Sequence, residues 1–172
     1  MSVLTEAAQI TIDPEKSYEI VTGRPEEKEM PGARHAVVAA NLVAELGIYL
    51  KTYHSGVVCA EANFKIGENE RIPDISFVAT ERIPTEGIPE GAWQFPPDLA
   101  VEIISPNDLH VKVSSKILEY FAAGVRQVWI VSPEHRSVTI FRSQIDIQVF
   151  AGDVELVSED LLPGFHCNLQ EL

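Results

Sequence analysis

The sequence predicts an α/β fold, on the basis of three observations. Apolar residues recur at helical spacing over residues 36–53, which predicts a long amphipathic helix. Three segments rich in Val, Ile or Phe follow, and each is bounded by Gly, Pro, Asn or Asp, as strands are. Residues 98–131 then show the order strand, helix, strand. A unit of this kind favours parallel pairing of its two strands with a right-handed crossover.

Length and composition suit one domain spanning residues 1–172, with 45% hydrophobic and 23% charged residues. The longest apolar runs, such as residues 125–131, are far shorter than the roughly 20 residues of a membrane span. The N-terminus has neither the basic segment nor the continuous apolar segment of a secretion signal. We therefore expect a cytoplasmic protein that does not associate with membranes.

The N-terminal third is expected to hold one long helix. Residues 12–23 are predicted to be extended, and the charged residues 24–29 with the following Met-Pro-Gly are predicted to form a turn or loop. The helix over residues 36–53 should face the core with Val37, Val38, Leu42, Val43, Leu46, Tyr49 and Leu50.

The middle of the chain is expected to supply strands. They are predicted over residues 56–66, 72–79 and 98–105. The stretch between the second and third, residues 80–97, holds four prolines and two glycines. It is predicted to be a loop that Trp93 and Phe95 dock onto the core.

The next helix should follow Ser105-Pro106, capped by Asn107 or Asp108 and ending at Gly124. Its apolar face should consist of Val113, Ile117, Tyr120 and Phe121. A strand over residues 127–131 comes next, and alternation over residues 137–142 and 146–150 predicts a hairpin.

Two acidic residues stand inside apolar strands, where an unpaired carboxylate is costly to bury: Asp74 and Glu102. Buried carboxylates are paired with cations, hydrogen-bonded or metal-bound, and two on neighbouring strands could hold one ion. Lys116 lies beside the apolar face of the following helix, about 60° from Val113 at the ~100° per residue of an α-helix. A lysine there can hold an attacking water or stabilise charge that develops on a phosphate.

Each residue also has an ordinary explanation when taken alone. Asp74 follows Pro73 at a strand start and could cap a turn. Lys116 could extend to solvent beside an apolar face, as lysines commonly do. Glu102 has fewer such explanations, because it lies in the middle of an apolar strand. Taken together, the three residues favour an active site over these separate explanations.

The same segments carry a family resemblance. They are PDISFV at residues 73–78, PDLAVEIISP at 97–106, KILEY at 116–120 and GVRQVWIV at 124–131. Together they resemble the bacterial Uma-type family of "putative restriction endonuclease" domains, over about residues 17–165. That family belongs to the PD-(D/E)XK nuclease superfamily. The resemblance implies a restriction-endonuclease-like mixed central sheet flanked by helices, and hydrolysis of phosphodiesters with a metal, usually magnesium.

Carried over residue by residue, the resemblance makes Asp74 and Glu102 metal ligands and catalytic residues. Ile104 stands where the superfamily has its lysine, and in the Uma-type branch that lysine lies on the following helix, here Lys116. Tyr120 also matches the helix pattern, although it could simply be a packing residue with a polar tip. The acidic residue and histidine upstream of the first long helix correspond to Glu27 and His35. Glu27 could equally be solvated surface, and His35 could cap the helix.

The formal net charge of −13 counts against a nucleic-acid binder, because such proteins usually carry a basic patch. A metal held by carboxylates can nevertheless reverse the local field. Motifs of nucleotide-binding loops, serine hydrolases and zincins are absent. The first hypothesis is therefore a Mg²⁺- or Mn²⁺-dependent endonuclease acting on DNA, plausible as a homodimer. The alternatives are a catalytically silent nuclease fold that serves as a binding or assembly module and, more weakly, a hydrolase of another phosphate ester.

Overall fold

The computed structural model describes residues 13–105 and 108–172. Its two α-helices are α1 (Ala33–Tyr53) and α2 (His110–Ala123), and its short 3-10 helices are η1 (Thr80–Arg82) and η2 (Leu169–Glu171). The strands within these residues are β1 (Tyr18–Val21), β2 (Arg24–Glu27), β3 (Gly56–Ala60), β4 (Phe64–Ile66), β5 (Asn69–Arg71), β6 (Ile75–Ala79), β7 (Leu99–Ile103), β8 (Gln127–Ser132), β9 (Ser137–Phe141), β10 (Ile147–Ala151), β11 (Glu155–Val157) and β12 (His166–Asn168).

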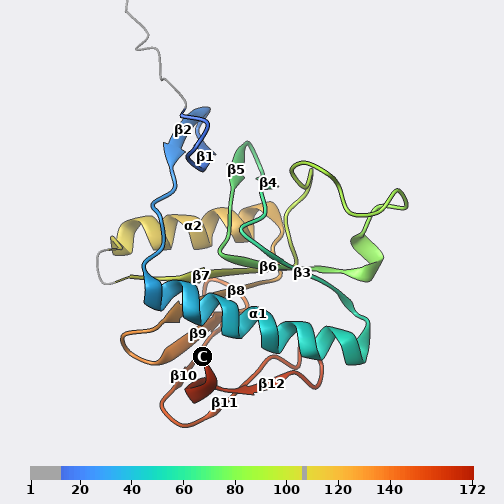
Figure 1. The fold of residues 1–172 in the computed structure, drawn as a ribbon, viewed down its shortest axis with the longest axis vertical. Coiled ribbons are helices and arrows are strands. Elements are labelled where there is room, and N and C mark those ends of the chain that lie inside the picture. The colour runs from blue at the N-terminus through green and yellow to red at the C-terminus, as the bar shows by residue number, and fades with distance from the viewer. Residues whose placement is uncertain (1–12, 106–107) are drawn as a thin grey trace, which may run out of the picture.

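A mixed six-stranded sheet in the order β10-β9-β8-β7-β6-β3 forms the centre of the molecule. Strands β7 and β8 are parallel and are joined through α2, while the other neighbours are antiparallel. Helices α1 and α2 lie on opposite faces of this sheet (Figure 1). The predicted α/β class, the mixed central sheet with flanking helices and the parallel strand–helix–strand unit are therefore confirmed.

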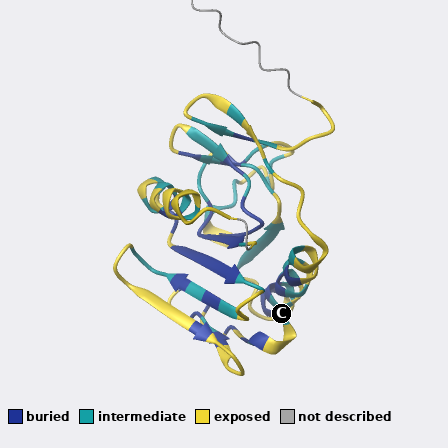
Figure 2. Ribbon diagram, turned by 90° about the vertical axis from the view of Figure 1, so that its left-hand side faces the viewer, coloured by how far each residue is buried: buried dark blue, intermediate teal, exposed yellow. Residues whose placement is uncertain are grey.

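The central strands are buried on both faces, which explains their near-continuous apolar sequences (Figure 2). Because side chains alternate along a strand, Val101 and Ile103 join the core under α1. Ala100 and Ile130 join a second core under α2, where Ile117 and Tyr120 pack. The acid Glu102 therefore points into the α2 side of the sheet.

A second, four-stranded sheet in the order β2-β1-β5-β4 lies next to α2 (Figure 1). Residues 24–29 were predicted to form a turn or loop. This prediction is wrong for residues 24–27, which form strand β2. Thr22 and Gly23 both have positive φ, 50° and 75°, which suits a two-residue hairpin turn and pairs β1 with β2. Pro25 is tolerated because β2 is an edge strand.

The single strand predicted over residues 56–66 is divided into two. The backbone turns at Glu61, where φ is +49°, so β3 joins the central sheet and β4 joins the small one. The strands predicted over 72–79 and 98–105 are shorter, as β6 and β7. In the loop after β6, Trp93 and Phe95 pack against the core under α2, as predicted, and Trp93 stacks on Phe64.

Both predicted helices and the C-terminal hairpin are present, with local differences. Helix α1 starts three residues early, and Val37 in its predicted core face is 57% exposed. Helix α2 begins after Leu109 without a side-chain cap; Asp108 instead accepts a hydrogen bond from the Ser105 N–H, and Asn107 lies outside the described residues. Helix α2 ends at Gly124 in the left-handed conformation, as predicted. Neither α-helix is long and apolar enough to cross a membrane, within the residues described.

Replacing Gly56 by alanine should destabilise the fold. A Cβ there would stand 2.2 Å from the Val78 carbonyl oxygen and 2.5 Å from the Phe77 ring, so β3 and β6 would have to separate. We expect Gly56→Ala to lower the free energy of unfolding by roughly 1–3 kcal/mol in urea denaturation. The control is Gly47→Ala in α1, where a Cβ meets nothing within 4 Å and alanine favours the helix. Equal stability of the two variants would contradict the close approach.

Candidate active site

Asp74 and Glu102 face one another at one end of the central sheet. Ile75 pairs with Val101 in the antiparallel β6–β7 ladder, and continuing this register by one residue sets Asp74 opposite Glu102. The Ile103 N–H donates to Asp74 Oδ2 at 2.7 Å, which ties the first carboxylate to the strand that carries the second. Both residues are buried, at 5% and 9% exposed. The predicted pair of buried carboxylates on neighbouring strands is thus present.

Helix α2 supplies two donors to Glu102. Lys116 and Tyr120 are four residues apart and so lie on one face of the helix. Lys116 Nζ donates to Glu102 Oε2 at 3.1 Å, and the Tyr120 hydroxyl donates to Oε1 at 2.5 Å. Each oxygen of this carboxylate therefore has its own partner from the helix that connects β7 to β8.

Asp74 is held by two groups from the N-terminal part of the chain. Lys28 Nζ, just after β2, lies 2.9 Å from Asp74 Oδ1 and also donates to the Ile72 carbonyl oxygen. His35 Nε2, in the first turn of α1, lies 3.0 Å from Asp74 Oδ2. The other ring nitrogen of His35 is buried and finds no hydrogen-bond partner in the described part of the chain. Buried polar atoms usually have a hydrogen-bond partner, so this nitrogen is an exception within the site.

A line of buried charges extends from Glu102 into the small sheet. Lys116 also bonds Glu19 Oε1 on β1 at 3.1 Å, and Glu19 Oε2 accepts from Arg71 Nη1 at 2.9 Å. Arg71 in turn binds Glu119 through two parallel hydrogen bonds of 2.9 and 2.7 Å. Such two-bond pairing is the strong geometry of arginine and carboxylate. It locks the small sheet against α2 and so holds Lys116 in place.

The two facing carboxylates have pKa values shifted in opposite directions. Burial alone would raise the pKa of Asp74, but the hydrogen bond with His35 and the charge of Lys28 outweigh it and lower the pKa to about 2. Burial raises the pKa of Glu102, despite the charge of Lys116. The charges of Glu102 and Glu19 overcome burial and raise the pKa of Lys116, so this amine stays protonated at neutral pH. Divergent pKa values in one acidic pair are common at active sites.

The structure brings together five of the six residues singled out from the sequence: Asp74, Glu102, Lys116, His35 and Tyr120. Glu27 is not among them. It lies on the exposed edge strand β2, half exposed, and forms an ion pair with Lys16 at 2.8 Å. The surface explanation for Glu27 is therefore the one the geometry supports.

Three residues of the cluster were missed from the sequence. Glu19 stands between Tyr18 and Ile20 in a strand, so the criterion that selected Glu102 could have found it. Arg71 and Lys28 had no such signal, because lysine and arginine in charged segments are usually solvated. Arg71 is buried where the small sheet packs against α2, and Lys28 is drawn to the site by Asp74, so both depend on tertiary contacts.

The comparisons with known proteins fit this geometry. Residues 4–170 match the Uma2 family, described as "Putative restriction endonuclease". The chain belongs to the Uma2 family. This Uma2 chain is also similar to a crystal structure from Anabaena variabilis ATCC 29413, described as "a putative nuclease belonging to DUF820", at 24% identity and a TM-score of 0.82. The match covers 94% of this chain and 92% of that one, and it shows that the two share a fold. No curated protein matches the sequence.

The resemblance to the Uma2 family implies a divalent metal ion. The side chains at the site are compatible with Mg²⁺ but not with Zn²⁺. Among the described residues no group of three or more His, Cys, Asp or Glu side chains could hold a metal ion. The described residues thus do not form a tetrahedral zinc site, which needs three or four such ligands. Mg²⁺ is commonly bound by one or two carboxylates, with water and substrate phosphate as the other ligands. Asp74 and Glu102 fit that requirement.

Asp74 should make the metal-free protein sensitive to acid. Because its pKa in the folded protein, about 2, lies below the ordinary value of 3.8, its charge stabilises the fold above pH 4. This contribution is about 2 kcal/mol and should fall as the pH drops from about 4 towards 2. We expect the stability difference between the parent and Asp74→Asn, measured by urea denaturation in EDTA, to shrink over this range. A difference that stays constant from pH 6 to pH 3 would contradict the ion pairing.

Proposed function

We propose that this Uma2 chain is a Mg²⁺-dependent endonuclease that hydrolyses DNA phosphodiester bonds. Asp74 and Glu102 would hold the metal, with Mn²⁺ as a possible substitute, and Lys116 would act on the attacking water or the phosphate. The observation that carries the proposal is that two buried carboxylates face each other across β6 and β7 with a protonated lysine on one of them. Membership of a nuclease family supports the reaction class.

The chemistry requires that water attack phosphorus and that the leaving oxygen depart with a proton. A bound divalent ion would lower the pKa of a water ligand and polarise the phosphate. Lys116 keeps its proton at neutral pH, so it is unsuited to deprotonate water. Its role would be to orient the water by donating a hydrogen bond, or to stabilise negative charge on the phosphate in the transition state.

The remaining members of the cluster would position these groups. Tyr120 fixes one oxygen of Glu102, and Glu19 accepts a second hydrogen bond from Lys116. His35 and Lys28 orient Asp74 and lower its pKa, which keeps it ionised for metal binding. A homodimer would provide two such sites, one for each strand of a duplex.

A catalytically silent binding module is the second candidate function, and one observation favours it. Lys28, His35, Lys116 and Tyr120 already satisfy both carboxylates without a metal, in a chain of net charge −13. Calorimetric titration of the chain with Mg²⁺ separates the two. Heat of binding that disappears in Asp74→Asn supports the nuclease, whereas no saturable binding supports the module.

Removing either carboxylate should abolish cleavage. We expect Asp74→Ala and Glu102→Ala each to lower the rate of DNA cleavage with Mg²⁺ by at least a thousandfold, because half of the metal's protein ligands are lost. Glu27→Gln is the matched control, since Glu27 pairs with Lys16 away from the cluster, and it should retain parental activity. The assignment fails if the parent cleaves no DNA, or if the two alanine variants cleave as fast as the parent.

Lys116→Met should separate catalysis from metal binding. Methionine keeps the apolar stem but lacks the charge, so kcat should fall by about 10²–10³-fold, as when one transition-state donor is removed. Mg²⁺ affinity by calorimetry should not decrease, because the variant also removes a cation that competes for Glu102. Loss of Mg²⁺ binding in this variant would show that Lys116 holds the site together rather than acting on the substrate.

A further inference from the structure

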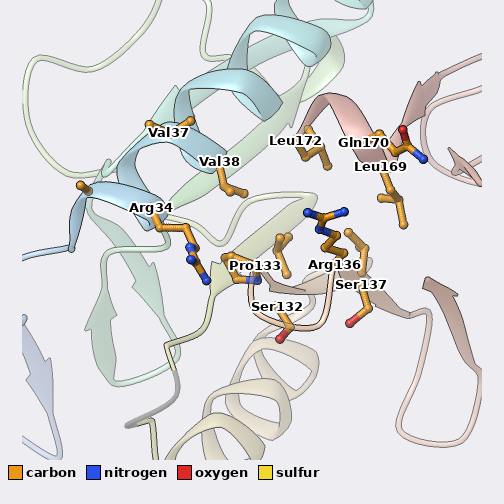
Figure 3. Close-up of a pocket in the computed structure, with 13 residues that line it drawn as sticks. Arg34, Val37, Val38, Ser132, Pro133, Arg136, Ser137, Leu169, Gln170 and Leu172 are labelled. Carbon is orange, nitrogen blue, oxygen red and sulfur yellow. The ribbon is translucent and has the colours of Figure 1, made fainter. Parts of the chain in front are cut away.

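A groove lies at the same end of the central sheet as Asp74 and Glu102, but on its α1 face. Its volume is about 510 Å³, and it is bounded by the first turns of α1, the end of β8, the β8–β9 turn and the C-terminal η2 (Figure 3). Its floor is apolar, from the buried residues Val38, Val131 and Leu169.

Two arginines are the only charged side chains among the residues that line this groove. Arg34 comes from α1 and Arg136 from the β8–β9 turn, and Figure 3 shows them on either side of Pro133. In the described part of the chain neither guanidinium group has an ion-pair partner, although the protein carries 26 acidic residues. The lining side chains of the groove thus carry positive charge only, on an acidic protein.

Two backbone connections link the groove to the candidate active site. Arg34 directly precedes His35, whose ring contacts Asp74 at 3.0 Å. Val131 in the groove floor is the ladder partner of Ile103, whose N–H holds the same Asp74 carboxylate. The groove is therefore built on the helix that carries His35 and on the strand that pairs with Ile103, two of the groups that hold Asp74.

We propose that this groove binds the part of a nucleic-acid strand that flanks the bond to be cleaved. Arg34 and Arg136 would bind successive backbone phosphates, because guanidinium groups match phosphate geometry. The apolar floor would receive a base or sugar, which a groove made for phosphate alone would not need. This inference rests on the proposed nuclease function, since it assigns the path of that enzyme's substrate.

Val37 provides a position at which the groove can be tested by substitution. Val37 and Ile48 lie on the same helix and are 57% and 60% exposed, but only Val37 lines the groove. The two residues therefore offer a matched pair of substitutions. A glutamate at position 37 would place a negative charge beside the arginines, whereas one at position 48 would lie outside the groove.

The inference is tested by the binding of a fluorescent single-stranded oligonucleotide to the protein in EDTA, measured as the fluorescence anisotropy of the oligonucleotide. The double variant Arg34→Ala/Arg136→Ala should weaken binding about tenfold or more. Its affinity should also depend less steeply on salt: the magnitude of the slope of log affinity against log salt should fall by about 1.4, as expected for the loss of two contacts to single-strand phosphates. Arg24→Ala/Lys51→Ala removes the same charge from residues that do not line the groove and should change binding less than twofold. Val37→Glu should weaken binding, and Ile48→Glu should not.

The outcomes distinguish this inference from the proposed function. The inference about the groove is contradicted if the parent does not bind the oligonucleotide, or if both double variants weaken binding equally. Cleavage with Mg²⁺ is measured separately on the same proteins. A parent that binds through the two arginines but cleaves nothing refutes the nuclease and leaves the groove standing. A parent that cleaves with unchanged kcat/KM in Arg34→Ala/Arg136→Ala refutes the groove alone.

Discussion

The burial of opposed carboxylates at one end of a sheet is the constraint on which the rest of this structure depends. Asp74 and Glu102 are almost fully buried, and a buried charge without a partner is strongly destabilising. Each carboxylate is therefore surrounded by cationic or hydroxyl groups from other elements. The small sheet, the first turn of α1 and one face of α2 all meet at this point because they deliver those groups.

Helix α2 connects the fold to the site. Its four-residue spacing presents Lys116 and Tyr120 to the two oxygens of Glu102, and Glu119 on the same helix binds Arg71 of the small sheet. The chain of contacts from Glu102 through Lys116 and Glu19 to Arg71 joins four elements, β7, α2, β1 and β5. A substitution in this chain affects the position of the lysine as well as stability, because these charges share partners.

The net charge of −13 is compatible with a polyanionic substrate because charge is unevenly distributed. Four cationic or donor groups surround the acidic pair, and two arginines without ion-pair partners line the groove beyond the first turn of α1, among the residues described. Local charge at a site, rather than the total, determines which ligand is attracted to it. Much of the acidic surplus lies on exposed surface such as Glu27 and Glu155.

The sequence by itself determined the α/β class, both helices, the β7–α2–β8 unit and the acidic pair. These features follow from apolar periodicity and from acids inside apolar strands, which are local properties. The sequence did not reveal strand β2, the break at Glu61 or the true start of α2, because these depend on turn conformations and on packing. The tertiary structure alone decided that Lys28 and Arg71 join the cluster, that Glu19 contacts Lys116 and that Glu27 lies outside it. Lys116 and Glu19 are 97 residues apart, and no local pattern encodes a contact across such a separation.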